Sequence, residues 1–168
     1  MRKVFFYLFI IAQIVILLVL VGQYYLIESY GKSFKIYLNE TYDYSTFNNH
    51  QDIYVEYEIT EIAKEHWSIN EKLSYNDRVY VMLEENTAGV FEVIDVAEHK
   101  LVTSSDQQVV LKANYVYDHA GMFKVDYRLN NEININQFVD VARDEKVVAH
   151  FKLAPWGQIK LITLENTE

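Results

Sequence analysis

The sequence predicts a mainly β protein: a single transmembrane helix at the N-terminus is followed by a β-sandwich or partly open β-barrel of about seven or eight antiparallel strands, with one or two short helices. Three observations predict this fold. Residues 4–27 carry no charge and would span roughly 36 Å as a helix, enough to cross a hydrocarbon core of about 30 Å. Beyond them, short segments rich in Val, Ile, Tyr and Phe alternate with polar residues. Asn, Asp and Gly separate these segments, as turn residues separate strands.

The apolar run at the N-terminus has features of both a membrane anchor and a secretory signal peptide, since both begin with a basic flank and an apolar core. Its core, from Val4 to Gly22, is longer than that of a typical signal peptide. It also lacks a clean pair of small residues at which a signal peptidase would cleave. The run therefore predicts an uncleaved anchor in the lipid bilayer.

The charges that flank the run predict its orientation. Arg2 and Lys3 precede it, and Glu28 is the first charge after it. Because cytoplasmic flanks carry an excess of Lys and Arg, we expect the N-terminus in the cytoplasm. The chain then divides into a cytoplasmic tip and anchor, residues 1–29, and one extracytoplasmic domain, residues 30–168.

The composition limits the classes of partner and of site. The chain has 15 Lys and Arg against 24 Asp and Glu, which gives a formal net charge of −9 at pH 7. Such a charge repels nucleic acid and should hold the domain away from anionic lipid headgroups. The chain has no cysteine, so it can form neither a disulfide nor a thiolate metal site. An extracytoplasmic domain without disulfides indicates a protein of the bacterial cell membrane.

Period-two alternation predicts strands along most of the outer part of the chain. The expected strands are Phe34–Leu38, Ile53–Ile59, Arg78–Glu84, Val90–Val96, Val109–Tyr117, Met122–Leu129, Lys146–Leu153 and Gln158–Leu164. Residues 85–89, 118–121 and 154–157 each contain a glycine and predict three hairpin turns. Helical spacing is present, weakly, at Thr60–His66 and more clearly at Ile135–Asp144.

Residues 50–59, His-Gln-Asp-Ile-Tyr-Val-Glu-Tyr-Glu-Ile, align with the motif Gly-Asp-Tyr-x-x-Leu-x-Tyr. Tyr57 matches its last residue and Val55 stands in for its leucine, whereas the Gly-Asp-Tyr triplet is absent. Residues 78–84 are similar to the strand before the first hairpin in proteins with this motif, and Gly157 opens a similar closing strand. With its N-terminal helix and β-rich remainder, the chain resembles the GDYXXLXY family of bacterial membrane-anchored proteins. This resemblance implies a membrane protein as partner and carries over no catalytic residue.

The histidines give little indication of a metal site. The five are scattered, and no two have the i, i+4 spacing with which one helix face binds a metal. Asp118, His119 and Asp126 could converge across a hairpin and hold a metal ion, although polar residues at a turn are commonly solvated. We expect the solvated turn, and therefore neither a metal nor another cofactor.

Two other arrangements resemble catalytic sites. Glu56 and Glu58 would share one face of a strand, as paired carboxylates for acid–base catalysis can, but their alternation with apolar residues predicts a half-buried strand. Ser29 and Ser33 lie just beyond the anchor with Lys35 close by, as in membrane-tethered hydrolases that use a serine and a lysine. The sequence around Lys35 is not apolar enough to bury its amine. We therefore predict no catalytic residue.

The remaining features predict binding. Gln13 lies at mid-span, where a hydrogen bond to a neighbouring helix would satisfy its amide; a single tolerated glutamine is the alternative. Tyr42, Tyr44 and Tyr57 are candidate partner contacts, in a domain whose tyrosines otherwise fill a core or cover a sheet. We predict a non-enzymatic accessory protein that partners an integral membrane protein through its helix and outer domain. The alternatives are a module that binds glycan or wall polymer of the cell envelope and, third, a membrane-tethered hydrolase.

Overall fold

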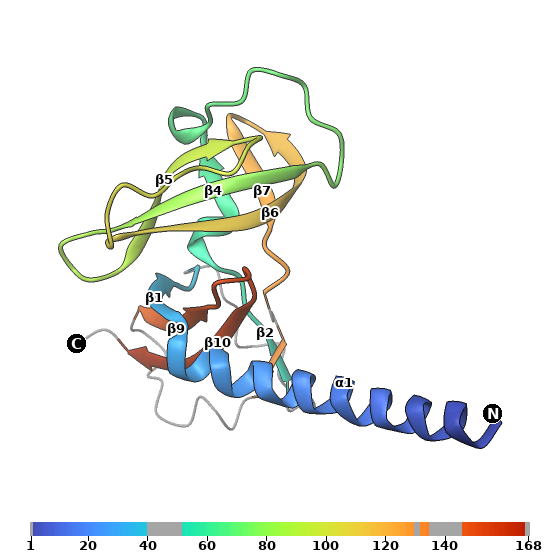
Figure 1. Ribbon diagram of the computed structural model, residues 1–168. Coiled ribbons are helices and arrows are strands. Elements are labelled where there is room, and N and C mark those ends of the chain that lie inside the picture. Colours follow the sequence, from blue (N-terminus) through green and yellow to red (C-terminus); the bar gives the residue numbers. More distant parts are fainter. Residues whose placement is uncertain (1, 40–51, 130–131, 135–145, 167–168) are drawn as a thin grey trace.

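The protein is mainly β, with one long helix that leaves the β-rich part as a separate rod (Figure 1). The computed structural model describes residues 2–39, 52–129, 132–134 and 146–166. Helix α1, Arg2–Tyr30, is the long rod, and its stretch Phe5–Tyr30 contains an 18-residue window that is strongly apolar. The most apolar part of this stretch makes no buried contact, so α1 is long enough and apolar enough to cross a membrane.

The described residues hold ten strands and two short 3₁₀ helices in chain order. The strands are β1 Lys32–Tyr37, β2 Asp52–Tyr54, β3 Glu61–Ala63, β4 Arg78–Glu85, β5 Phe91–Ala97, β6 Gln108–His119, β7 Met122–Asp126, β8 Glu132–Asn134, β9 Val147–Leu153 and β10 Ile159–Asn166. The 3₁₀ helices are η2, Glu58–Thr60, and η3, Lys64–His66.

The strands form two main antiparallel sheets. One has the order β1-β9-β10 and lies next to the end of α1, and the other has the order β3-β7-β6-β4-β5 and lies farther from it (Figure 1). A third pair, β2 and β8, is also antiparallel. The prediction of a β-rich, antiparallel domain behind one apolar helix is thereby confirmed.

Alternation along the strands builds the core between the two main sheets. In β4, Val79, Val81 and Leu83 are fully buried at every second position, as period-two geometry requires. In β1, Phe34 and Ile36 point into the same core. Each buried aliphatic side chain of this kind contributes about 1.5–3 kcal/mol by leaving water.

Aromatic rings join the two sheets. The Phe34 ring of β1 stacks on the Phe151 ring of β9, with centroids 5.4 Å apart and planes 21° apart. It also meets the Phe91 ring of β5 edge to face, with centroids 6.1 Å apart. Tyr57 adds an edge contact to Phe151 at 5.3 Å. The three-stranded sheet is therefore packed on the five-stranded sheet through one aromatic cluster.

The three predicted hairpins are confirmed. They join β4 to β5, β6 to β7 and β9 to β10. Gly89, Gly121 and Gly157 adopt φ values of 76°, 84° and 90° in these turns, a left-handed conformation that costs glycine no steric strain.

Two predicted elements are corrected. The strand expected at Ile53–Ile59 ends at Tyr54, where its pairing with β8 stops. The chain then turns into η2, where the Tyr57 carbonyl accepts hydrogen bonds from the backbone N–H and the hydroxyl of Thr60. The helical spacing at Thr60–His66 belongs instead to β3 and η3, because β3 pairs with β7. The helix expected at Ile135–Asp144 lies outside the described residues.

Candidate functional site

Helix α1 exposes apolar side chains on all sides. Gln13 is exposed in the middle of the span, and the side chains one turn away on the same face, such as Phe9 and Leu17, are exposed too. A polar amide on a surface suited to lipid has no water with which to form hydrogen bonds. The predicted contact residue Gln13 therefore lies where a neighbouring helix could reach it.

The last turn of α1 is built into the domain. Ile27 is only 1% exposed, and the backbone N–H of Gly31 donates to the Ile27 carbonyl at 2.9 Å. Lys152 of β9 donates from Nζ to the Glu28 carbonyl, one of the last carbonyls of the helix, which have no partner within it. Lys160 of β10 lies 3.4 Å from the Glu28 carboxylate. Two strands therefore hold the end of the helix, and β1 begins directly after it.

Gly31 makes this junction possible. A Cβ atom at this position would lie 2.4 Å from the Ile27 carbonyl oxygen and 3.0 Å from the Cβ of Lys152. Real Cβ atoms do not approach backbone oxygen so closely, so only glycine lets the chain turn this tightly from α1 into β1. The helix and the three-stranded sheet are consequently joined without a flexible linker.

The predicted tyrosine contacts have different outcomes. Tyr57 is 0% exposed and packs in the aromatic cluster, so its prediction as a partner contact is wrong. The reason is its position beside the edge of the first sheet: Tyr57 bridges Leu38 and points inward between the two sheets. Tyr42 and Tyr44 lie outside the described residues.

The acidic residues of the hairpin β6–β7 have local roles. The Tyr115 hydroxyl donates to Asp118 at 2.5 Å, and burial together with this hydrogen bond raises the pKa of Tyr115 to about 12. Asp126 accepts from the backbone N–H of Arg128 at 2.7 Å, and His119 is exposed. Over the described part of the chain, no three His, Asp or Glu side chains gather in a way that could hold a metal ion.

The two glutamates compared with a carboxylate pair are separated by the structure. Glu58 is exposed, whereas Glu56 is half-buried and pairs with Lys124 of β7. Lys124 also lies 3.4 Å from Glu61 of β3. Burial disfavours the charged form of Lys124, but the hydrogen bond and charge of Glu56, helped by Glu61, outweigh it and raise the pKa of Lys124 above its ordinary value. The arrangement is a set of ion pairs that links β7 to β3 and to the segment just before η2.

The residues compared with a serine–lysine hydrolase lie in exposed positions. Ser33 and Lys35 share the outer face of β1, and Ser29 is exposed on the last turn of α1. Lys32 donates to the Gln108 carbonyl at 2.7 Å. Within the ranges that the structure describes, no hydrogen bond joins Ser29 or Ser33 to either lysine. The geometry therefore gives this hypothesis no support.

Two contacts in the structure join residues that are far apart in the sequence and that the sequence alone does not pair. Lys124 meets Glu56 across 68 residues of sequence, and Lys152 meets the carbonyl of Glu28 across 124. The only local signal is the polarity of these lysines within apolar strands, which does not name a partner.

The chain was compared with family models, with curated proteins and with solved structures, and no match was found. The resemblance to the GDYXXLXY family stays a prediction.

Proposed function

We propose that this protein is a membrane-anchored accessory subunit that binds an integral membrane protein and catalyses no reaction itself. The observation that carries the proposal is α1: its apolar stretch Phe5–Tyr30 is unburied along its most apolar part, while its last turn is held by the β domain. A helix with a fully exposed apolar surface suits contact with lipid and with other membrane helices.

Gln13 is the residue of α1 that a partner helix would recognise, by a hydrogen bond to its side-chain amide. In lipid, an amide side chain without a partner is unfavourable, and a hydrogen bond to a neighbouring helix contributes about 0.6–2 kcal/mol. The side chains around Gln13 are large and apolar. A partner helix that offers a single polar group at this depth would therefore be favoured over one that offers none.

The rigid junction extends this contact into the domain. Because Lys152 and Lys160 hold Glu28, a partner that binds α1 also meets the β domain in a defined orientation. We place the N-terminus in the cytoplasm and the β domain outside a bacterial cell membrane, as the charges of Arg2 and Lys3 favour. The resemblance to the GDYXXLXY family supports the same assignment.

The test is affinity purification of the full-length protein in mild detergent, followed by mass spectrometry of what is retained. The wild type is compared with Gln13→Leu and with the matched variant Gln23→Leu, which changes a glutamine nearer the end of the span. We expect a polytopic membrane protein with the wild type and with Gln23→Leu, and less of it with Gln13→Leu.

Two results would contradict the proposal. Recovery of the chain alone from all three preparations would exclude a stable membrane partner. Retention of cell-wall polymer in place of a membrane protein would favour the envelope-binding alternative.

A further inference from the structure

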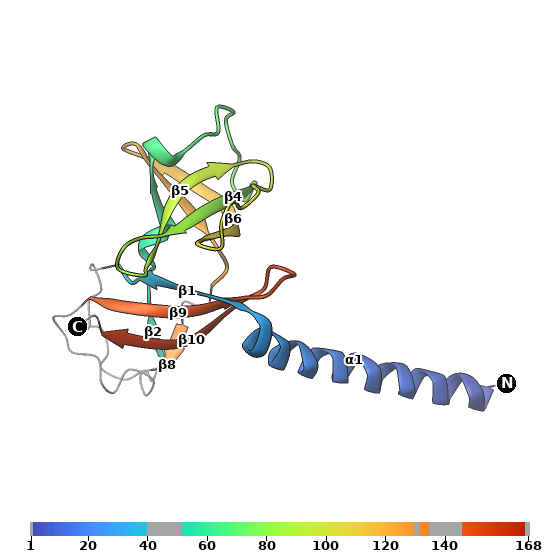
Figure 2. The same cartoon turned by 60° about the vertical axis from the view of Figure 1, so that its left-hand side comes forward.

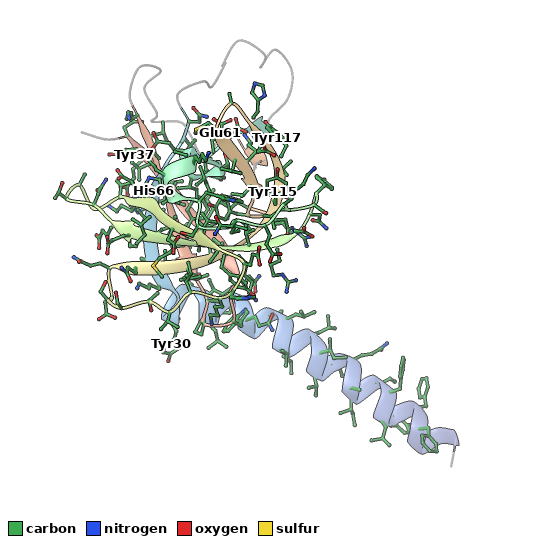
Figure 3. The ribbon with its side chains drawn as sticks, turned by 90° about the horizontal axis from the view of Figure 1, so that it is seen from above. Tyr30, Tyr37, Glu61, His66, Tyr115 and Tyr117 are labelled. Carbon is green, nitrogen blue, oxygen red and sulfur yellow. The ribbon has the colours of Figure 1, made fainter. Side chains whose placement is uncertain are left out.

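A cavity of about 560 Å³ opens beside the junction between α1 and the domain. This volume lies in the range of roughly 300–1,000 Å³ that small-molecule sites occupy. Four parts of the chain line the cavity: the end of α1 with the start of β1, β4, the loop before β6 with the first half of β6, and the turn between β9 and β10. We call it the junction pocket. Tyr30, which lines it, is the last residue of the apolar span and lies at the end of α1, well away from Tyr115 and Tyr117 (Figure 3).

The junction pocket is basic in a chain that is acidic. Its lining includes Lys32, Lys100 and Lys112 and no Asp or Glu, although the chain carries a net charge of −9. Among the residues that the structure describes, neither Lys100 nor Lys112 forms an ion pair. The Lys112 ammonium lies 3.9 Å from the place of a Cβ on Gly157, beside the turn between β9 and β10. The pocket therefore presents positive charge that nothing in its lining neutralises.

Lys32 adds a positioned donor. Its ammonium donates to the Gln108 carbonyl at 2.7 Å, and an ammonium has two further N–H donors. Gln108 itself is held by a hydrogen bond from its side-chain N–H to Glu84 at 2.8 Å. One of the three lysines is thus held in place by the fold, while the other two are exposed.

The negative end of the helix dipole does not cancel this charge. The last carbonyls of α1 carry a partial negative charge, which would disfavour an anion nearby. Lys152 donates to one of these carbonyls, and Lys160 lies beside the carboxylate of Glu28. Separate lysines therefore compensate the helix end, and those of the pocket are left for a ligand.

The rim of the pocket suits the surface of a membrane. Trp156 is 46% exposed and Val102 is 87% exposed, and both line the pocket together with Tyr30. Trp and Tyr are enriched where hydrocarbon meets lipid headgroups. The turn that carries Trp156 extends in the direction in which α1 leaves the domain (Figure 2).

We propose that the junction pocket binds the phosphate of an anionic lipid headgroup in the same membrane that α1 enters. The three lysines attract the phosphate, and the aromatic and apolar rim lies against the headgroup region. The net charge of the chain repels anionic lipid on average, but screening at physiological salt limits each charge to a range of about 8 Å. At the pocket, the local lysines therefore outweigh the acidic surface elsewhere.

The test is native mass spectrometry of the full-length protein in detergent micelles, titrated with phosphatidylglycerol or with phosphatidylcholine. We expect phosphatidylglycerol to bind at least about tenfold more tightly than phosphatidylcholine, because each lysine near a headgroup favours an anionic lipid. The double variant Lys100→Gln/Lys112→Gln should lose this preference. Lys32 is left unchanged, because its hydrogen bond to Gln108 supports the fold.

The matched control is Lys64→Gln/Lys72→Gln, which removes two exposed lysines outside the pocket and changes the net charge equally. It should keep the preference, and both double variants should unfold at the temperature of the wild type. Equal binding of the two lipids, or equal loss in both variants, would overturn the proposal. A third arm uses glycerol 1-phosphate: binding as tight as that of the lipid, with the same dependence on Lys100 and Lys112, would assign the pocket to a soluble phosphate and reject the lipid.

Discussion

The backbone N–H of Gly31 donates to the carbonyl of Ile27 at 2.9 Å, and a Cβ at Gly31 would lie 2.4 Å from that same oxygen. This one contact ends α1 and starts β1 within a single residue. Because Ile27 is also buried, the helix that is suited to a membrane and the β domain share a packed joint. The joint therefore sets the orientation of the β domain relative to α1.

Gly31→Ala should destabilise this joint. The added methyl group must displace the Ile27 carbonyl or the Lys152 side chain, and overpacking of this kind costs about 1–3 kcal/mol. Thermal unfolding of the full-length protein in detergent, followed by circular dichroism of the strands, measures the effect. Gly22→Ala is the control, because a Cβ there meets nothing within 4 Å and alanine favours a helix. Equal melting temperatures for the two variants would contradict the claim that the junction at Gly31 is too closely packed for a side chain.

Tyr57→Ala should remove an anchor of the core. The ring is 0% exposed and contacts Phe151, and truncation of a buried aromatic side chain costs about 3–5 kcal/mol. Denaturant unfolding of the full-length protein gives the free energy directly. Tyr75→Ala changes a side chain that is 76% exposed and should stay within about 0.5 kcal/mol of the wild type. If Tyr57→Ala were as stable as the wild type but lost a binding partner, the result would instead support Tyr57 as a partner contact.

Lys124→Met should destabilise the domain by roughly 1 kcal/mol, because it leaves the half-buried Glu56 without its cation. The double variant Lys124→Met/Glu56→Gln should recover part of the loss, since no charge is then left unpaired. Lys64→Met is the matched control, because Lys64 is exposed. Urea unfolding at neutral pH measures all four proteins. No recovery in the double variant would argue that the stem of Lys124, rather than its charge, stabilises the sheet.

Stability should fall above pH 10. Burial raises the pKa of Tyr57 and Tyr127 above the ordinary value of 10.0, so the unfolded chain releases these protons first as the pH rises. Their contribution to the free energy of unfolding is complete below pH 10.0 and is lost as the pH rises through the folded-state pKa values. The raised pKa of Lys124 has the same sign: its contribution is present below 10.5 and is lost above it.

Unfolding in urea between about pH 8 and pH 11, with tyrosinate absorbance recorded in parallel, tests this dependence. Tyr127→Phe should flatten the decline, and it should also cost about 0.5–1.5 kcal/mol at neutral pH, since the Tyr127 hydroxyl donates to the Ile59 carbonyl at 2.9 Å. Tyr75→Phe should leave the profile unchanged. Ionisation of every tyrosine near pH 10 in the folded protein would refute the prediction.

The orientation in the membrane can be read from a single cysteine, because the natural chain has none. Tyr75→Cys places a thiol on the exposed surface of the domain. If the positive-inside prediction is correct, a membrane-impermeant maleimide labels this thiol in intact cells. Labelling that occurs only after lysis would place the domain in the cytoplasm.

The sequence was informative where structure depends on nearby residues. Val79, Val81 and Leu83 recur at every second position between Arg78 and Glu84, and the strand predicted there is β4. The turns at Gly89 and Gly121 follow from conformations that glycine adopts without strain. In contrast, β3 and β8 have three residues each, too few to leave a periodic pattern, and no strand was predicted at either; the expected count of about seven or eight strands broadly matches the ten described.

Less of the candidate site could be predicted from the sequence. Gln13 could be selected because a polar residue inside an apolar run is visible locally. The burial of Tyr57 depends on a bridge to Leu38, and the role of Lys124 depends on Glu56, which lies 68 residues away. Neither relation has a local signal.

By itself, then, the sequence determined the apolar helix, the β-rich class and the hairpins, because each is decided by residues a few positions apart. Only the tertiary structure decided that Gly31 joins the helix to the domain without a linker. It also brought Lys32, Lys100 and Lys112 to one pocket in an acidic protein. The physical reason is the order of the strands, β1-β9-β10 and β3-β7-β6-β4-β5, which places side chains from distant segments together, whereas a sequence pattern records only near neighbours.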